Sequence, residues 1–269
     1  MASANQQEKA DRFAALHEGP AFVIPNPWDA GSARMLEALG FEALATTSSG
    51  FAFTLGRVDG GVSLDEMAAH VTGLDEATGL PVSADLENGY GPDPEDAART
   101  IRRIGAAGAV GGSIEDWDRD EGRLYERQEA AERIAAAVEA ARNLPFRFML
   151  TARAENHIRG VTDLDDTIHR LWAFEEAGAD VLYAPGLGSV AEIRTVCDAV
   201  SRPVNVLALP GLSLAEIVDA GARRVSVGGA LTWAAVQAAA DAAIALRDSG
   251  DIGPLAARPP VRDWLAAPD

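Results

Sequence analysis

The chain of 269 residues contains one cysteine, Cys197, which excludes an internal disulfide framework and a zinc site built from cysteines. It has no run of eighteen uncharged apolar residues, and its first nine residues are polar, so neither a membrane span nor a signal peptide is expected. Basic residues are scarce, with 23 Lys and Arg against 41 Asp and Glu, and a formal charge of -18 would repel nucleic-acid phosphates. We therefore expect a cytoplasmic protein that binds neither membranes nor nucleic acids.

The chain is rich in a repeated pattern of short apolar runs and helical segments. Ala-rich stretches with helical periodicity lie between the runs, and several of these stretches end in a glycine suited to a helix C-terminus. Eight such units over roughly 250 residues match the dimensions of a (β/α)₈ TIM barrel. The runs lie at residues 22–24, 43–45, 82–84, 110–114, 146–150, 181–183, 204–207 and 225–227.

The main alternative is an open, doubly wound α/β sheet. Its usual nucleotide-binding mark, G-x-G-x-x-G after the first strand, is missing after Ile24, where the chain reads Pro-Asn-Pro-Trp-Asp, and no P-loop is present. The barrel is therefore favoured, as one domain over residues 1–269. Residues 248–269, with two glycines and four prolines, are expected to form an extra C-terminal segment that could pack on a neighbouring subunit.

The most informative stretch follows the third run, where Asp85 and Glu87 precede Gly89-Tyr90-Gly91. In an extended chain, side chains at i and i+2 point the same way, so the two carboxylates should converge. Their mutual repulsion would be relieved by a hard cation such as Mg²⁺, which takes oxygen ligands. The alternative is a solvated strand end followed by a glycine-rich turn.

Other polar residues also follow the predicted strands. Barrel enzymes place their chemistry at the carboxyl ends of the strands, so these residues should form one ring. Asp85, Glu87 and Glu115 would form an acidic side for a cation, and Arg153 a planar fork for a carboxylate or phosphonate. Ser49 and the amides of Gly50 and Phe51 could hold a second oxyanion. The remaining members of the ring are Asn26, Trp28, Asp29, Ser48, Asp116 and Asn205.

The ordered set of these motifs resembles the isocitrate lyase/phosphoenolpyruvate mutase superfamily over residues 20–245. It comprises Trp28-Asp29-Ala30, Ser49-Gly50-Phe51, residues 56–59, Asp85-x-Glu87-x-Gly89-Tyr90-Gly91, Ile114-Glu115-Asp116, Ala152-Arg153 and Pro203-Val204-Asn205. The resemblance implies a (β/α)₈ barrel that uses Mg²⁺, with Mn²⁺ as an alternative, to form or cleave C-C or P-C bonds beside a 2-oxo acid through an enolate. It also implies a homotetramer or dimer in which the last helix is exchanged between subunits.

The resemblance further assigns roles to individual residues. Asp85 would be the direct metal ligand, with Glu87 and Glu115 acting partly through water. Ser49, Gly50 and Phe51 would hold the substrate carboxylate, while Trp28 and Asp29 would line the pocket floor. Asp59, on a glycine-rich loop at residues 55–61, matches a mobile-loop aspartate near the reaction centre, and Arg153 would grip the leaving or migrating group. The loop could close over the substrate as a lid, or be a plain connection.

The chain departs from the superfamily pattern in two loops. The isocitrate and methylisocitrate lyases carry Lys-Lys/Arg-Cys-Gly-His after the strand-four acids, whereas residues 117–125 here contain neither Cys nor His. The mutases place a histidine at the end of strand six, where this chain has Pro185. Both departures weaken the fit to those particular activities. Glu87 also replaces the commoner aspartate.

The remaining candidates are mostly structural. His17 and His70 are predicted on solvated helix faces, and His169 within a helix. Trp172 and Trp233 are predicted in helix cores, and Cys197 is predicted as a buried residue on a helix between strands six and seven. The exception is His157, four residues after Arg153, which could serve as an acid near the barrel mouth.

These observations predict an Mg²⁺-dependent lyase or decarboxylase that cleaves a C-C bond of a small 2-oxo or 2-hydroxy dicarboxylate. His157, Asp59 and Arg153 are the predicted catalytic residues, and Asn205 completes the substrate-binding set. The alternatives are a phosphonopyruvate-type P-C mutase or hydrolase and a metabolite-binding barrel without turnover.

Overall fold

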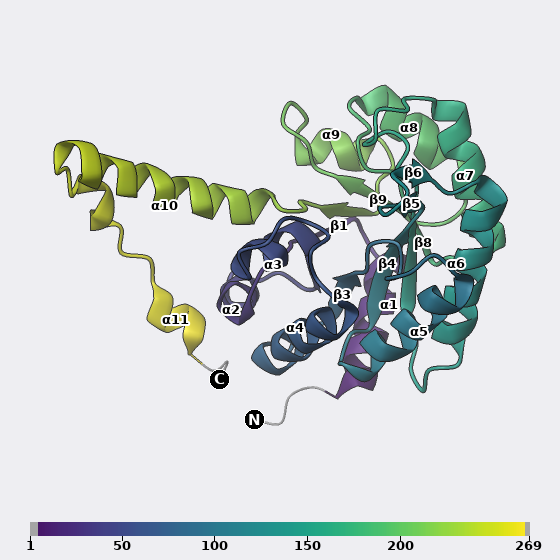
Figure 1. Ribbon diagram of the computed structural model, residues 1–269, viewed down its shortest axis with the longest axis horizontal. Helices are drawn as coiled ribbons and strands as arrows, with labels where there is room; N and C mark the ends of the chain where they lie inside the picture. The colour runs from purple at the N-terminus through teal and green to yellow at the C-terminus, as the bar shows by residue number, and fades with distance from the viewer. Residues whose placement is uncertain (1–4, 267–269) are drawn as a thin grey trace.

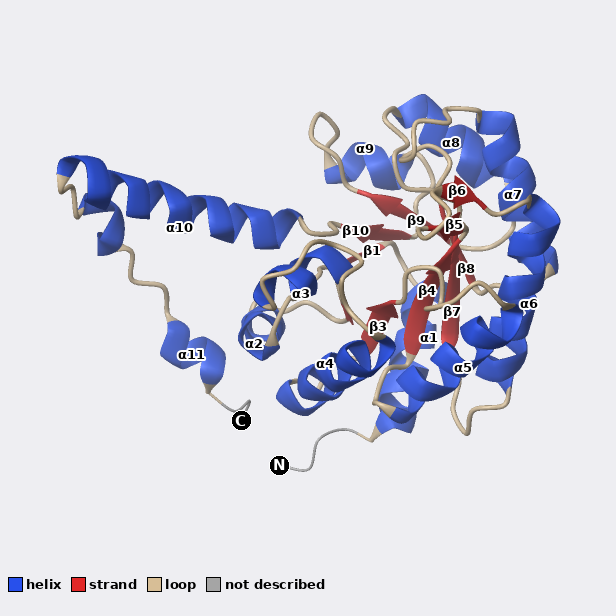
Figure 2. Ribbon diagram, viewed as in Figure 1, coloured by secondary structure: helices blue, strands red, loops and turns tan. Residues whose placement is uncertain are grey.

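A computed structural model, describing residues 5–266, folds into a barrel of eight parallel strands surrounded by helices (Figures 1 and 2). The strand order is β1-β10-β9-β8-β7-β4-β3-β2, and the amide of Ala45 donates to the carbonyl of Pro25 at 3.0 Å to bridge β2 and β1. The predicted barrel is therefore confirmed, and the open sheet is excluded. The barrel strands are β1 (Phe22–Ile24), β2 (Leu44–Ala45), β3 (Val82–Asp85), β4 (Gly111–Glu115), β7 (Met149–Arg153), β8 (Val181–Tyr183), β9 (Val204–Leu207) and β10 (Arg224–Ser226).

Helices follow the strands in the expected alternation, and a small hairpin is inserted after β4. This hairpin, β5 (Trp117–Asp118) and β6 (Arg123–Leu124), occupies the region where the superfamily lyases carry their Cys loop. The helices are α1 (Gln6–Glu18), α2 (Ala30–Ala38), α3 (Ser48–Thr54), α4 (Leu64–Ala77), α5 (Pro94–Ala106), α6 (Arg127–Arg142), α7 (Leu164–Glu176), α8 (Val190–Ala199), α9 (Leu214–Asp219), α10 (Ala230–Ser249), η1 (Gly253–Ala256) and α11 (Val261–Leu265).

Local sequence signals set the helix ends. Pro94 opens α5, and Ser213 with Glu216 forms a capping box at the start of α9. The predicted C-terminal glycines all have positive φ, at Gly40 (87°), Gly108 (113°), Gly178 (98°) and Gly221 (109°). A glycine adopts this left-handed conformation without the clash that a Cβ would cause, so the chain can turn back toward the next strand.

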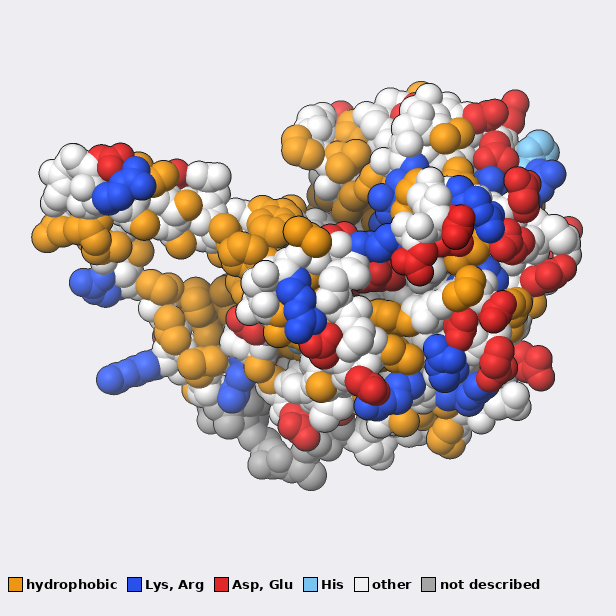
Figure 3. Space-filling view, viewed as in Figure 1, with side chains coloured by type: hydrophobic (Ala, Val, Ile, Leu, Met, Phe, Trp, Pro, Cys, Tyr) orange, Lys and Arg blue, Asp and Glu red, His pale blue; other side chains and the backbone are white. Residues whose placement is uncertain are grey.

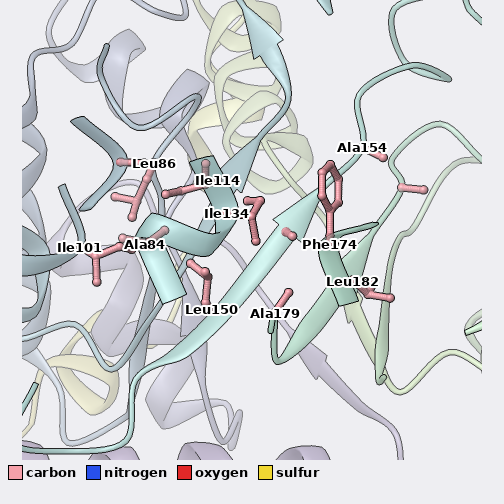
Figure 4. Packing of buried hydrophobic residues seen from close by; sticks show 14 of the residues in the cluster. Ala84, Leu86, Ile101, Ile114, Ile134, Leu150, Ala154, Phe174, Ala179 and Leu182 are labelled. Carbon is pink, nitrogen blue, oxygen red and sulfur yellow. The ribbon is translucent and has the colours of Figure 1, made fainter. Parts of the chain in front are cut away.

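The main core lies between the sheet and the helices α5, α6 and α7. Leu86, Ile114 and Leu150 pack there against Ile134 and Phe174 (Figure 4), and all five side chains are buried. Such cores contribute roughly 25 cal/mol for each Å² of apolar surface removed from water. The eight-strand frame is therefore held rigidly behind the polar side chains that its strand ends carry.

The N-terminal end of the barrel is plugged by α1. Phe13 packs against the backbone of Gly111, and His17 makes edge-to-face contacts with both Phe13 and Phe22. The prediction that His17 lies on a solvated face was wrong, because α1 turns that face into the barrel end. The same prediction for His70 was also wrong, because this residue is buried. Its ring stacks on that of Phe51, with 3.8 Å between the ring centres.

The two tryptophans predicted in helix cores are instead half-exposed. Trp172 on α7 and Trp233 on α10 expose 44% and 45% of their surface, because each sits on the outer side of its helix. Trp172 still anchors α7 by donating its indole N–H to the carbonyl of Ala199 at 2.7 Å. Cys197 lies on α8 as predicted, beneath Gly221 and partly buried, and burial raises the pKa of its thiol to about 11.

Helix α10 projects away from the barrel, and α11 returns to lie against α2 (Figure 1). Of the twenty residues of α10 only Thr232 is buried. The described residues leave out both ends of the chain: residues 1–4 of the polar N-terminal segment and residues 267–269 of the predicted C-terminal segment. None of the helices between residues 5 and 266 is long and apolar enough to cross a membrane.

Candidate active site

A cavity of about 60 Å³ lies inside the barrel, and every barrel strand contributes a residue to it. TIM-barrel interiors are usually filled by bulky branched side chains, whereas this one is lined largely by polar groups. Asp85 and Arg153 stand at the carboxyl ends of β3 and β7. The other lining residues are Ile24, Asn26, Ala45, Thr46, Thr47, Ser83, Ala84, Ser113, Tyr183, Asn205, Arg224, Ser226 and Gly228.

Asp85 is fixed at the end of β3 by the chain that follows β2. Its amide donates to the hydroxyl of Thr46 at 2.8 Å, and one carboxylate oxygen accepts the amide of Ser48 at 3.3 Å. The Arg153 guanidinium lies 3.8 Å from its other oxygen. Asp85 therefore faces the cavity with a carboxylate that is oriented on two sides.

Glu87 is close to Asp85, but for a different reason from the predicted one. Strand β3 ends at Asp85, and Glu87 has a positive φ of 50°, so the two residues are not alternate positions of one extended strand. The Glu87 side chain is buried, its Oε1 has no hydrogen-bond partner, and its Oε2 lies 3.2 Å from Arg119. Burial, opposed by Arg119 and reinforced by Asp85 and Asp59, raises the pKa of Glu87 to about 7.

Glu115 ends β4 and is almost completely buried. Its carboxylate lies 3.5 Å from Arg153 and 3.6 Å from Arg159. Burial raises the pKa of Glu115 well above its usual range, while Arg153 opposes that rise. Asp116, the next residue, turns away and accepts the amide of Glu155 and the guanidinium of Arg170, so it supports the scaffold.

Arg153 is the central cation of the site. Its Nε pairs with the fully buried Glu155, its Nη1 approaches Asp85 and Glu115, and its guanidinium lies 5.3 Å from the ring centre of Tyr183. Burial alone would lower the pKa of Arg153, but Glu115 and Glu155 raise it well above the usual value. The guanidinium is therefore a permanent positive charge held in a largely dry site.

The acidic side chains of the site are the kind of ligand that a hard cation takes. The acidic groups offer only oxygen ligands, which suit Mg²⁺ and Mn²⁺, and the buried Oε1 of Glu87 lacks any partner. In the described part of the chain, no three His, Cys, Asp or Glu side chains are grouped closely enough to enclose a metal ion. Arg153 and Arg119 instead lie against the three acids, so the acids are balanced by arginines.

The predicted substrate-binding residues divide into two groups. Asn205 lines the cavity. Trp28 and Asp29 line a separate pocket between α2 and α11, and the Asp29 carboxylate caps α2 by accepting the amide of Ser32 at 2.7 Å. The structure therefore does not place Trp28 and Asp29 on the floor of the main cavity.

The segment predicted to hold an oxyanion forms the short helix α3. The amides of Gly50 and Phe51 both donate to Thr47, so they are not free as a loop nest would be. Gly50 is required for close packing, because a Cβ there would overlap Thr47 and Thr232. The Ser49 hydroxyl contacts that of Thr47 at 3.2 Å.

The glycine-rich loop at residues 55–61 reaches the acidic side of the site. Asp59 is exposed, yet its charge contributes to raising the pKa of Glu87. Gly60 lies directly against the Arg119 guanidinium, which would overlap a methyl group at that position. The loop, the hairpin after β4 and Glu87 are therefore linked through Arg119.

His157 is buried beneath the turn after β8, and its backbone and Cβ lie against Gly186. Its Nε2 has no hydrogen-bond partner, and the residue is not among those that line the cavity. Its proposed role as an acid stays a prediction.

Comparison with known proteins decides the family. Residues 13–247 match the family description "Phosphoenolpyruvate phosphomutase". The chain belongs to this family, within the isocitrate lyase/phosphoenolpyruvate mutase superfamily, and is an enzyme of that superfamily.

The relatives differ in their named activities. A candidate lyase/mutase from Burkholderia cenocepacia J2315 has a crystal structure with a TM-score of 0.94 and 54% identity, covering 98% of each chain. The 2-methylisocitrate lyase of Escherichia coli (strain K12) is 30% identical over 80% of this chain and 71% of its own. An oxaloacetate decarboxylase of Rhodopseudomonas palustris (strain TIE-1) is 30% identical over 82% of this chain and 78% of its own.

Sequence reasoning missed several residues of the candidate site. Arg119, Glu155 and Arg159 form ion pairs with the predicted residues, and Tyr183 and Arg224 line the cavity. Tyr183 ends β8 and Glu155 follows Arg153 by two residues, so a complete reading of strand ends would have included both. Arg119 comes from an inserted hairpin, and its sequence position gives no comparable signal.

Proposed function

We propose that the protein is an Mg²⁺-dependent lyase or decarboxylase that cleaves a C-C bond of a small 2-oxo or 2-hydroxy dicarboxylate. The observation that carries the proposal is that Asp85 and Arg153 line one polar cavity, with Glu115 beside Arg153 at 3.5 Å and the buried Glu87 close enough to Asp85 for their charges to interact. Oxygen donors and a fixed guanidinium on one cavity suit a substrate with two anionic ends.

The acidic residues would bind the cation, and the arginine would bind an anionic group of the substrate. Asp85, Glu87 and Glu115 would hold Mg²⁺ or Mn²⁺, which supplies positive charge where an enolate develops when the bond beside the carbonyl breaks. Arg153 would bind the anionic group that leaves, because its planar fork matches a carboxylate. Glu155 holds the Nε side of Arg153, so the fork is oriented before substrate arrives.

Loop closure would complete the site. Asp59 and Gly60 lie on the glycine-rich loop, and Arg119 connects that loop to Glu87. Closure would exclude water from the enolate and prevent its premature protonation by solvent. We propose that Asp59 contacts the reaction centre in the closed state.

A P-C mutase or hydrolase is the second candidate, favoured by the match to the phosphoenolpyruvate phosphomutase family. C-C cleavage is preferred because Pro185 and Gly186, which follow β8, offer no side-chain hydrogen-bond donor to hold a phosphonyl group. The named relatives that are 30% identical include a methylisocitrate lyase and oxaloacetate decarboxylases.

A substrate panel tests the proposal. Release of a 2-oxo acid is measured with Mg²⁺ from oxaloacetate, substituted malates, methylisocitrate and phosphonopyruvate, with Asp85→Ala as the variant. We expect turnover of a C-C substrate that is lost with EDTA and in the variant. Turnover of phosphonopyruvate alone would instead support P-C chemistry, and turnover that Asp85→Ala leaves unchanged would contradict the metal site.

A further inference from the structure

Four cavity residues lie in one register across four adjacent strands. Arg153 on β7 pairs with Tyr183 on β8, Tyr183 with Asn205 on β9, and Asn205 with Arg224 on β10. All four line the same cavity. The row therefore runs from Arg153, at the carboxyl end of β7, to the buried Arg224 at the start of β10.

Two hydrogen bonds lead from the arginine end of this row to Ser226 on β10, and both donate in the same direction. The Nε–H of Arg224 donates to Asn205 Oδ1 at 2.8 Å, and the Asn205 amide donates to Ser226 Oγ at 3.0 Å. The Ser226 hydroxyl in turn shares a hydrogen bond with the phenol of Tyr183. Burial raises the pKa of Tyr183, while Arg153 and the hydrogen bond with Ser226 lower it. A chain of bonds polarised in one direction strengthens each member.

Arg224 supplies the charge at the start of the chain. It is buried, and within the described residues its side chain bonds only neutral acceptors: Asn205, Thr151 at 2.9 Å and His17 at 3.3 Å. The His17 ring accepts this bond through Nε2, while Nδ1 lies 2.8 Å from the Phe13 carbonyl. A buried cation without a carboxylate partner is costly, and this one lines the cavity with its charge not neutralised by any acid among its hydrogen-bond partners.

We propose that Tyr183 is the proton donor to the enolate carbon, held in place by the Arg224–Asn205–Ser226 chain; this rests on the proposed lyase function. In decarboxylation of a 2-oxo dicarboxylate, the bond to the distal carboxylate breaks, CO₂ leaves, and the electron pair stays on the remaining 2-oxo fragment as its enolate. The Tyr183 O–H bond then breaks and a new C–H bond forms, giving the 2-oxo acid and a phenolate. The phenolate, beside Arg153 and the Ser226 hydroxyl, regains its proton from water after product leaves.

Neither the hairpin after β4 nor His157 supplies a competing proton donor to the cavity. The hairpin after β4 contains no Cys or His, and His157 does not line the cavity. Tyr183 is the only tyrosine among the cavity-lining residues, and its ring already lies against the Arg153 guanidinium. General acids of this kind contribute about 10²–10⁴ in rate.

Exchange of the pyruvate methyl protons in D₂O tests the proposal, because exchange requires proton transfer to and from the enolate carbon. With Mg²⁺ present and NMR detection, we expect Tyr183→Phe to lose exchange at least 100-fold. The Mg²⁺-dependent rise in melting temperature caused by oxalate, an enolate mimic, should remain as in the wild type. Tyr125→Phe, which also removes a buried phenol hydroxyl, bonded to Asn88 at 3.1 Å, should exchange normally.

The outcomes separate this proposal from the proposed function. Exchange by Tyr183→Phe at the wild-type rate would overturn the role of Tyr183 and leave the lyase intact. A wild type that neither exchanges pyruvate nor cleaves any panel substrate would overturn both. Ser226→Ala should slow exchange about tenfold with oxalate binding unchanged, and Ser226→Thr should restore the wild-type rate. Equal exchange rates in the wild type, Ser226→Ala and Ser226→Thr would overturn the role of the Arg224–Asn205–Ser226 chain.

Discussion

At the scale of single residues, the site is governed by how buried charges are balanced. Arg153 approaches three carboxylates, and Arg119 holds one oxygen of Glu87. Removing one member of such a group leaves its partners buried and uncompensated, which costs more than the pair contributes. Substitutions here should therefore act on activity through geometry as well as through charge.

Replacing Arg153 by Lys keeps the charge and removes the planar fork. We expect kcat/KM to fall by about 10²-fold or more, because a lysine cannot bond Glu155 and a substrate carboxylate together. Steady-state kinetics on the substrate found in the panel measures this. Arg142→Lys is the control, since Arg142 pairs with Asp180 at 2.8 Å outside the cavity. Equal activity of both variants would show that Arg153 does not bind substrate.

The burial of His17 should make the free energy of unfolding depend on pH. Burial, with help from Arg224, lowers the pKa of His17 from 6.5 to about 3, so the folded state keeps this ring neutral while the unfolded state takes up a proton. The contribution is fully present above pH 6.5 and is lost as the pH falls toward 3, by up to about 1.4 kcal/mol per pH unit.

Urea unfolding between pH 7 and pH 5 measures this dependence. His17→Gln should be less stable at pH 7 and should lose less stability on acidification than the wild type. His169→Gln, a substitution on the exposed face of α7, should follow the wild type. A wild-type slope retained in His17→Gln would contradict the assignment.

At the scale of elements, the loop at residues 55–61 depends on close contact with the hairpin after β4. Gly60 has a φ of 83° and lies against Arg119, which in turn pairs with Glu87. The contact gives the loop a direct path to the acidic side of the site.

The Gly60→Ala variant tests this contact. A methyl group must displace Arg119, so we expect kcat/KM to fall about tenfold, beyond the roughly 1–2 kcal/mol that a left-handed alanine costs in stability. Gly40→Ala carries the same backbone cost at φ 87° but meets no atom within 4 Å, so it should lose stability without losing activity. Equal kcat/KM values for Gly60→Ala and Gly40→Ala would contradict a role in catalysis for the contact between the loop and Arg119.

The elements also show which features the sequence could predict. All eight strands were found, because strands buried on both faces are continuous apolar runs. The closeness of Arg153 to Asp85 and Glu115, and the place of Asn205 in the cavity wall, could be predicted because strand ends converge in a barrel, while the roles of these residues stay predictions. The left-handed turn at Glu87 and its pairing with Arg119 could not be found, since both depend on how an inserted hairpin folds over the site. The burial of His17 depends on α1 closing the far end of the barrel.

At the scale of the whole molecule, α10 and the segment after it form an apolar arm. Hydrophobic side chains gather along this arm (Figure 3), among them Trp233, Ile244, Leu246 and Leu255, each at least 45% exposed. A monomer rarely leaves so much contiguous apolar surface in water. We propose that the arm packs on a second copy of the chain, in a dimer or tetramer.

Light scattering coupled to size-exclusion chromatography tests the assembly. We expect the wild type to elute at two or four times the monomer mass and Leu246→Asp to shift toward monomer. Leu214→Asp is the control, because Leu214 on α9 is as exposed, at 49% against 47%, but lies outside the arm. A monomeric wild type would contradict the proposal.

The central proposal is that Asp85, Glu87 and Glu115 would hold a divalent cation beside Arg153, where it would supply positive charge to an anionic substrate. Calorimetric titration of oxalate into the protein, with and without Mg²⁺, tests it most directly. The account predicts binding that requires Mg²⁺ and is abolished in Asp85→Ala, while the variant keeps the wild-type fold by circular dichroism. Oxalate binding of equal strength without Mg²⁺, or in Asp85→Ala, would contradict it.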